Sequence, residues 1–230
     1  MKKNKKAFTL AEVLITLGII GVVAAMTLPV LVANYQKQAT VAKLKKVYSI
    51  LNQAYKMSES ENGFSEEWGN EIQEINTENV QKYVQRYWLP YLKVIGECSK
   101  SGDCSYPDNV MALDKNPDGT VDLVGNNRYT LILADGTLIA FVPFSWDGKN
   151  QIINGDQKFY VDINGAQRPN MLGKDVFIFE LNANKHAICA VGQDNSTENL
   201  NKVCNKNSNG WFCAAKIIHD GWEIKKDYPW

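Results

Sequence analysis

The stretch that decides the fold is KKAFTLAEVLITLGIIG, residues 5–21, in which lysines are followed by a long apolar run. Residues 13–33 carry no charged side chain. A helix rises 1.5 Å per residue, so this segment is long enough to cross the roughly 30 Å hydrocarbon core of a bilayer. The stretch therefore predicts a membrane-spanning helix whose lysine-rich start stays in the cytoplasm.

Two ordinary interpretations of this segment leave Glu12 without a purpose. A cleavable export signal would end at a small-residue site, which Ala24 and Ala25 could supply, but hydrophobicity does not fall after Ala25. A plain single-pass anchor has the right length, yet a lone carboxylate in lipid costs about 3 kcal/mol unless it is paired. The glutamate calls for a third interpretation.

The run Lys6-Ala7-Phe8-Thr9-Leu10-Ala11-Glu12, followed by apolar residues, resembles the N-terminal signature of type IV prepilins and type II secretion pseudopilins. The resemblance implies that prepilin peptidase cuts between Ala7 and Phe8 and that the new amine of Phe8 is methylated. Residues 1–7 would then be a cytoplasmic leader peptide. Most members of the family have Gly before the cut, and here it is replaced by Ala7, which is also small.

The resemblance also implies a partner for Glu12, which becomes the fifth residue after the cut. In the family this carboxylate is matched to the N-terminal ammonium of a neighbouring subunit, and pairing lowers the cost of a charge in lipid. Pro29 stands where the family's helix-breaking proline stands, so a helix break is expected there. The implied partners are prepilin peptidase, identical or related pilin subunits, the inner-membrane assembly machinery and membrane lipid.

The helix is expected to continue beyond the membrane. Apolar side chains recur at intervals of three and four, with Lys and Gln between them, and they predict an amphipathic continuation: Val32, Tyr35, Ala39, Leu44, Val47, Tyr48, Leu51 and Tyr55. We therefore expect a transmembrane and assembly helix over residues 8–33 and an exported head over 34–230. Residues 34–58 of the head continue the helix.

The head itself is predicted to be small and antiparallel. Thr77 can cap a second helix that ends before Pro90. The Asp135-Gly136 pair predicts a hairpin between residues 128–134 and 137–142. Further short strands are expected over 158–163, 176–181 and 186–191. The predicted fold class is α+β and pilin-like, with the long N-terminal helix packed on a small antiparallel sheet.

The five cysteines all follow residue 90, in the part predicted to be exported, which favours an oxidising compartment. The short polar loops between Cys98 and Cys104 and between Cys204 and Cys213 favour those two disulfides, although sequence alone does not prove a pairing. Cys189 lies in an apolar strand and is expected to be a buried free thiol.

Calcium is the only cofactor that the sequence suggests. Asp114, Asn116, Asp118 and Asp122 occupy ligand positions of a calcium loop, but Gly125 stands where a bidentate Glu would be expected. Asp162, Asn164 and Asp175 form a second oxygen-rich set. Some pseudopilin heads bind calcium in their C-terminal loops, so the resemblance keeps both sets as candidates.

Other function classes find little support. The chain has 25 basic and 25 acidic residues, and four of the lysines precede Ala7. The remainder is mildly acidic, so direct nucleic-acid binding is not expected. His186 and Cys189 are three apart on a predicted strand and would point to opposite faces, so we predict no enzyme.

The predicted function is a structural subunit of a type IV pilus-like or type II secretion pseudopilus filament. Its expected location is the inner membrane, crossed once, with the head in the periplasm or outside. The alternative is a membrane-anchored exported binding protein that does not polymerise.

Overall fold

The computed structural model describes residues 9–69, 72, 74–100, 103–106, 109–125, 127–142 and 157–230. The chain divides into two compact units, Met1–Ala39 and Thr40–Trp230, and each is considered by itself. One helix, α1 (Leu10–Asn62), contributes its first part to the first unit and its last part to the second.

In the first unit, the described residues are the start of α1 and the residue before it. Its large apolar side chains are exposed, among them Leu14, Ile20 and Leu31, each at least 60 % accessible. This is the one helix in the described residues that is long and apolar enough to cross a membrane. A continuous apolar surface of this kind indicates contact with lipid or with other helices.

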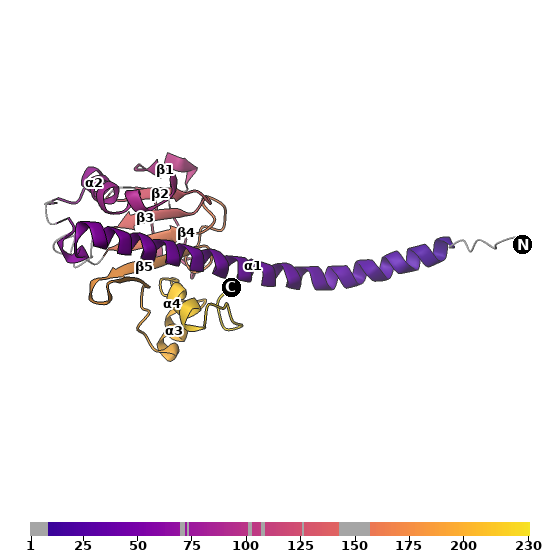
Figure 1. The fold of residues 1–230 in the computed structure, drawn as a ribbon. Coiled ribbons are helices and arrows are strands. Elements are labelled where there is room, and N and C mark those ends of the chain that lie inside the picture. The colour runs from indigo at the N-terminus through magenta and orange to yellow at the C-terminus, as the bar shows by residue number, and fades with distance from the viewer. Residues whose placement is uncertain are drawn as a thin grey trace, which may run out of the picture. The chain divides into compact units, whose positions relative to one another are not determined.

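The second unit, called the head below, is built on an antiparallel sheet. Six strands in the described residues pair in chain order, each beside the next (Figure 1). They are β1 (Val94–Cys98), β2 (Tyr129–Leu133), β3 (Leu138–Val142), β4 (Lys158–Asp162), β5 (Val176–Asn182) and β6 (Ala187–Ala190). With the long α1, this sheet confirms the predicted α+β, pilin-like layout.

Both faces of the sheet are buried at β2 to β5, and alternate residues of these strands point to different clusters. On β3, Ile139 and Phe141 pack in the cluster that contains the last part of α1, whereas Ala140 packs in the cluster on the other face. The α1 face receives Leu44, Val47, Leu51, Ala54 and Tyr55, which are all 0–1 % exposed. From Leu44 on, the predicted amphipathic half of the helix is therefore a core element of the head, whereas Val32 and Tyr35, predicted for the same stripe, are 51 % and 70 % exposed.

Helix α2 (Thr77–Tyr87) also covers this face. It begins one residue earlier than predicted, because the side chain of Asn76 rather than Thr77 accepts the capping hydrogen bond, from the Asn79 amide at 2.9 Å. Aromatic rings link α2 to α1 through Trp68, which lies in the segment between them: its ring centroid is 4.9 Å from that of Tyr87 on α2 and 5.7 Å from that of Tyr55 on α1.

The hairpin between β2 and β3 forms where it was predicted, but its loop is longer than Asp-Gly alone. Leu133 pairs with Thr137, which leaves three residues in the loop, and the amide of Gly136 donates to the Leu133 carbonyl at 2.9 Å. Gly136 has a φ of +85°, the left-handed conformation that closes a three-residue loop.

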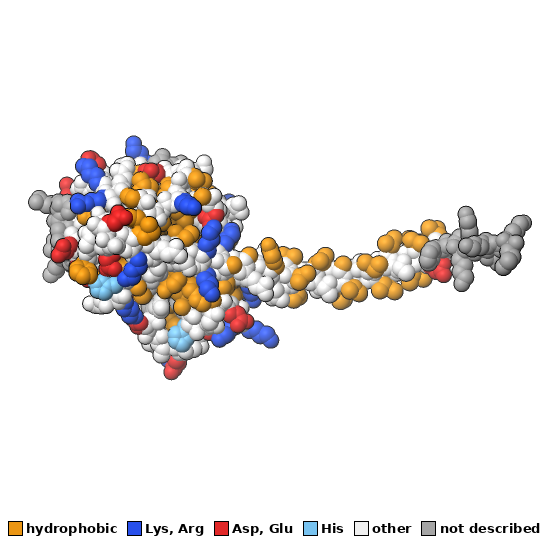
Figure 2. Space-filling model, in the orientation of Figure 1, with side chains coloured by type: hydrophobic (Ala, Val, Ile, Leu, Met, Phe, Trp, Pro, Cys, Tyr) orange, Lys and Arg blue, Asp and Glu red, His pale blue; other side chains and the backbone are white. Residues whose placement is uncertain are grey.

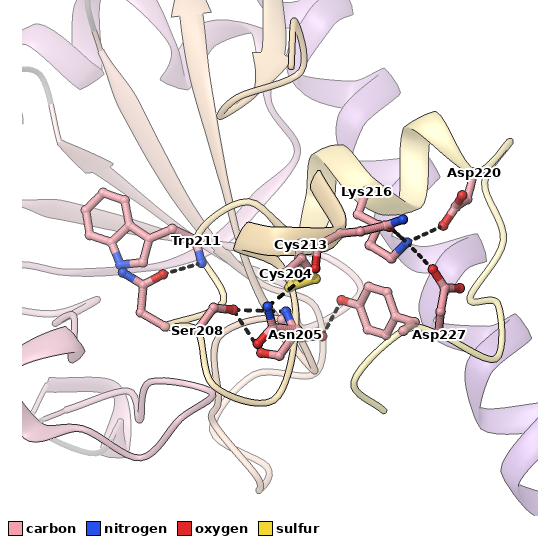
Figure 3. Close-up of a disulfide and its surroundings, with 12 residues drawn as sticks. Cys204, Asn205, Ser208, Trp211, Cys213, Lys216, Asp220 and Asp227 are labelled. Carbon is pink, nitrogen blue, oxygen red and sulfur yellow. Dashed lines mark hydrogen bonds and ion pairs between the residues drawn. A yellow bond between two sulfur atoms is a disulfide. The ribbon is translucent and has the colours of Figure 1, made fainter. Parts of the chain in front are cut away.

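The C-terminal part contains two short helices that the sequence did not predict, α3 (Thr197–Val203) and α4 (Cys213–His219). Figure 3 shows the Cys204–Cys213 disulfide that joins them and the side chain of Lys216 beside it. Lys216 is 2 % exposed, and its Nζ atom lies 2.7 Å from Asp227 and 3.2 Å from Asp220. A buried ammonium requires such partners, so this contact fastens the C-terminal segment to α4.

Candidate assembly segment and sites in the head

The N-terminal segment begins with a capping box. The backbone amide and the hydroxyl of Thr9 both donate to Glu12 Oε2 at 2.8 Å, and the Glu12 amide donates to Thr9 Oγ1 at 3.3 Å. This reciprocal pattern is typical of a Thr-x-x-Glu helix start. The motif was readable in the sequence and was missed there. It gives Glu12 a partner within its own chain.

The other polar side chains of this segment are also satisfied locally. Thr16 Oγ1 donates to the Glu12 and Val13 carbonyls, at 3.0 and 2.9 Å, and Thr27 Oγ1 donates to the Val23 carbonyl at 2.9 Å. Hydroxyls that bond back to the helix backbone need no outside partner. The segment can therefore enter a bilayer without leaving these groups unpaired.

The predicted helix break at Pro29 is absent: α1 runs through this residue without interruption. Proline removes one backbone donor from a helix, but its fixed φ is close to the helical value. The remaining hydrogen bonds on both sides keep the helix continuous here. Ala7 and Phe8, the predicted cleavage and methylation positions, lie outside the described residues.

Both predicted disulfides are present, Cys98–Cys104 and Cys204–Cys213, and Cys189 is a free, buried cysteine. Burial raises the pKa of the Cys189 thiol, which makes it a poor nucleophile at neutral pH. His186 contacts a different residue, with its Nδ1 atom 2.8 Å from Glu59 Oε1.

The first calcium candidate does not gather its side chains around one point. Asp122 pairs with Arg128, with 3.2 Å between Oδ2 and the guanidinium. Asp114 and Asn116 instead accept hydrogen bonds from backbone amides two residues later, as in ordinary turns. These two and Asp118 line an open cleft.

The second candidate set is brought together, but as a hydrogen-bond network. Asp162 accepts from the Tyr106 hydroxyl at 2.6 Å and from the Asn164 amide at 3.0 Å. Asp175 accepts from the amides of Asn170 and Met171 at 2.8 and 2.7 Å. Each carboxylate oxygen is thus already an acceptor, and burial raises the pKa of Asp162 to about 7.

As arranged, these residues do not fit a calcium ion, which takes six to eight oxygen ligands. Over the described parts of the chain, no group of three or more His, Cys, Asp or Glu side chains is arranged to hold a metal. The Asp162 network instead ties the end of β4 to the loop before β5.

Two known families match the chain, each over a different part of it. Residues 2–28 match the prokaryotic N-terminal methylation motif, which is the prepilin-type signature. Residues 30–230 match a family of unknown function (DUF6613). The chain belongs to this family.

The methylation motif bears directly on function, whereas the DUF6613 family does not. The motif marks the chain as a prepilin-like substrate of the type IV pilus and pseudopilus systems. No curated protein and no solved structure matches the chain.

Proposed function

We propose that this DUF6613 protein is a filament subunit of a type IV pilus-like or type II secretion pseudopilus assembly. The observation that carries the proposal is the methylation motif at residues 2–28, which includes the exposed apolar start of α1. Prepilin peptidase would remove residues 1–7 and methylate Phe8. The N-terminal helices would then bundle, with the heads outside.

In this proposal Glu12 exchanges one partner for another. Before assembly Thr9 satisfies its carboxylate within the chain. In the filament the charge would pair with the methylated N-terminus of a neighbouring subunit, which would favour a single axial register. The internal cap lowers the cost of holding the unassembled subunit in the membrane. Local melting at Pro29 would belong to the assembled state, since the single subunit keeps its helix there.

The capping box also favours a second candidate, an anchored exported binding protein that never polymerises. If Glu12 serves only to start the helix, no neighbouring subunit is needed to explain it. The chain offers a substitution that separates the two functions, because Gln can replace Glu in a capping box but carries no charge.

We expect Glu12→Gln to insert normally but to be lost from sheared filaments, because only the charge that pairs between subunits is removed. Thr16→Ala is the matched control one turn away, and it should assemble as the wild type does. Immunoblots of membrane and sheared fractions measure both. Normal incorporation of Glu12→Gln would favour the anchored binding protein.

Processing is tested by the intact mass of the membrane-extracted protein. A chain that begins at Phe8 and carries one added methyl group is the expected result. A chain that begins at Met1, or at Met26 after signal-type cleavage, would contradict prepilin processing.

A further inference from the structure

The C-terminal segment of the head packs beside the point where α1 enters the head. The ring centroids of Trp222 and Tyr48 are 5.4 Å apart, and Lys45 Nζ lies 5.8 Å from the centroid of the Trp222 ring. The head begins at Thr40, so both α1 residues follow soon after its first residue. Figure 1 shows the C-terminus beside this part of α1.

The end of α4 places Trp222 in this position. The amides of Gly221 and Trp222 donate to the carbonyls of Ile218 and Ile217 at 3.0 and 2.9 Å, which is the Schellman pattern of a helix C-terminus. Gly221 has the left-handed φ of +81° that this pattern requires, and Trp222 follows with a φ of +63°. A left-handed conformation is uncommon for a bulky residue, so the Trp222 ring is held against α1 at a cost in backbone strain.

The unpaired charges around Trp222 are mostly positive. Three other lysines of this region are ion paired: Lys46 with Asp135 at 2.6 Å, Lys216 with Asp227 at 2.7 Å and Lys225 with Asp220 at 3.0 Å. Within the described residues, Lys43, Lys45 and Lys226 are exposed and have no carboxylate partner, whereas Glu223 is the acidic residue of the C-terminal segment that stays unpaired. Figure 2 shows Lys and Arg side chains gathered on the head around the place where α1 enters it.

The chain itself keeps this surface close to the predicted membrane span. The charge-free stretch 13–33 ends seven residues before Thr40, and seven residues reach at most about 25 Å even when fully extended. Trp side chains are enriched at the interface between membrane and water, and lysines are attracted to anionic headgroups. A half-buried Trp beside unpaired lysines, tethered this near to a bilayer, therefore fits the headgroup layer.

We propose that Trp222, Lys45 and Lys226 form a lipid-docking surface, which rests on anionic phospholipid headgroups while the subunit resides in the membrane. The inference rests on the membrane-resident stage of the proposed function and goes beyond it, because docking needs no polymerisation. Docking would hold the head against the bilayer before assembly, and incorporation into a filament would release it.

The test reconstitutes the membrane-extracted full chain in nanodiscs of phosphatidylcholine, with or without phosphatidylglycerol. Hydrogen exchange over residues 220–228 should be slower in the anionic nanodiscs than in the neutral ones, and exchange in β3 and β4 should be the same in both. Lys45→Gln with Lys226→Gln should remove most of the difference, because each lysine near an anionic surface strengthens binding about fivefold.

The matched control is Lys56→Gln with Lys82→Gln, which removes the same charge from other parts of the head. Lys56 also lies over an aromatic ring, with its Nζ atom 5.2 Å from the centroid of Tyr55, but it is eleven residues or about 16 Å beyond Lys45 on α1. Lys82 lies on α2. The control should keep the difference between the two nanodiscs. If the control lost it as well, the total charge of the head would be responsible and the docking surface would be wrong.

Fluorescence quenching gives a second readout, which is specific to the Trp222 ring. Lipids brominated near the headgroup quench a tryptophan only at short range. In anionic nanodiscs, quenching should be stronger for the wild type than for Trp222→Phe, which keeps an apolar ring at this position.

The outcomes separate docking from the function. A chain that inserts but exchanges equally in both nanodiscs, or a quenching that Trp222→Phe leaves unchanged, overturns docking and leaves the filament function standing. A chain that fails to insert into either nanodisc overturns the membrane-resident stage of the proposed function and, with it, docking.

Discussion

At the scale of single residues, the buried carboxyl group of Asp162 makes the stability of the head depend on pH. It is 0 % exposed, and burial raises its pKa from 3.8 to about 7. Between these two values the folded protein binds more protons than the unfolded chain, so the free energy of unfolding falls as the pH rises from 4 to 7. Asp175, whose pKa burial also raises, adds to this slope.

We expect Asp162→Asn to flatten this slope and to stabilise the protein at pH 7 relative to the wild type. Asn keeps an acceptor for the Asn164 amide and removes the buried charge. Each unit of pKa shift is equivalent to about 1.4 kcal/mol, so a gain of about 1–2 kcal/mol is expected after relaxation. Urea unfolding of the detergent-solubilised protein at pH 4 to 8 measures it.

Asp135→Asn provides the control of opposite sign. Burial raises the pKa of Asp135, but hydrogen bonds from Lys46 and Thr137 outweigh this and lower the pKa overall. A lowered pKa contributes stability that is present above about pH 4 and is lost as the pH falls. The control should therefore lose stability at pH 7. An Asp162→Asn variant that loses stability in the same way would contradict the assignment.

At the scale of elements, Asn52 on α1 closes the outer edge of β6. Its Oδ1 accepts from the Ile188 amide at 3.0 Å, and its Nδ2 donates to the Ile188 carbonyl at 3.1 Å. The Asn52 side chain thus satisfies the amide and the carbonyl of Ile188, which could otherwise form hydrogen bonds with a further strand. This protects the edge from pairing with other chains and fixes α1 against the sheet.

We expect Asn52→Ala to lower the free energy of unfolding by about 1–3 kcal/mol, because it leaves the buried amide and carbonyl of Ile188 unpaired. Gln53→Ala, on the adjacent exposed position, should change it by less than about 0.5 kcal/mol. Denaturant unfolding of both variants gives the comparison. Equal effects would mean that the Asn52 amide does not hold the edge.

The elements that the sequence predicted are those with strong periodicity or a clear turn. The apolar repeat of α1 and the alternation in β3 to β5 were sufficient to predict these elements. The end of α1 was predicted less well, because the helix continues to Asn62, four residues past the predicted end. Strand β1 was missed because Gly96 and an irregular register at Val94 hide its alternation. Helices α3 and α4 have seven residues each and rely on a disulfide, so their local signal is weak.

The same difference between local and long-range signals separates the candidate sites. The assembly segment could be read from sequence because its meaning lies in the order of adjacent residues. The two calcium candidates could not be assessed from the sequence. Whether a carboxylate oxygen is free to bind an ion depends on hydrogen-bond donors that are distant in the sequence. Tyr106 donates to Asp162 across 56 positions, and no spacing rule predicts such a contact.

At the scale of the whole molecule, contacts that differ in chemistry hold the C-terminal segment to the rest of the head. The Cys204–Cys213 disulfide joins α3 to α4, Lys216 binds Asp227, and the Tyr228 hydroxyl donates to the Gly173 carbonyl at 2.5 Å. The disulfide restricts the unfolded chain, whereas the other two contacts act in the folded state. If the head is exported, as proposed, an oxidising compartment would keep this disulfide formed.

We therefore expect Cys204→Ala with Cys213→Ala to lower the free energy of unfolding by about 3 kcal/mol, the chain-entropy value for a loop of this length. Hydrogen exchange should rise throughout α3 and α4 and remain unchanged in β3 and β4, whose strands are central in the sheet. The matched control is Cys98→Ala with Cys104→Ala, which should raise exchange only near β1. If exchange rose uniformly over the head after the first substitution, the disulfide would be supporting the entire core and not the C-terminal segment alone.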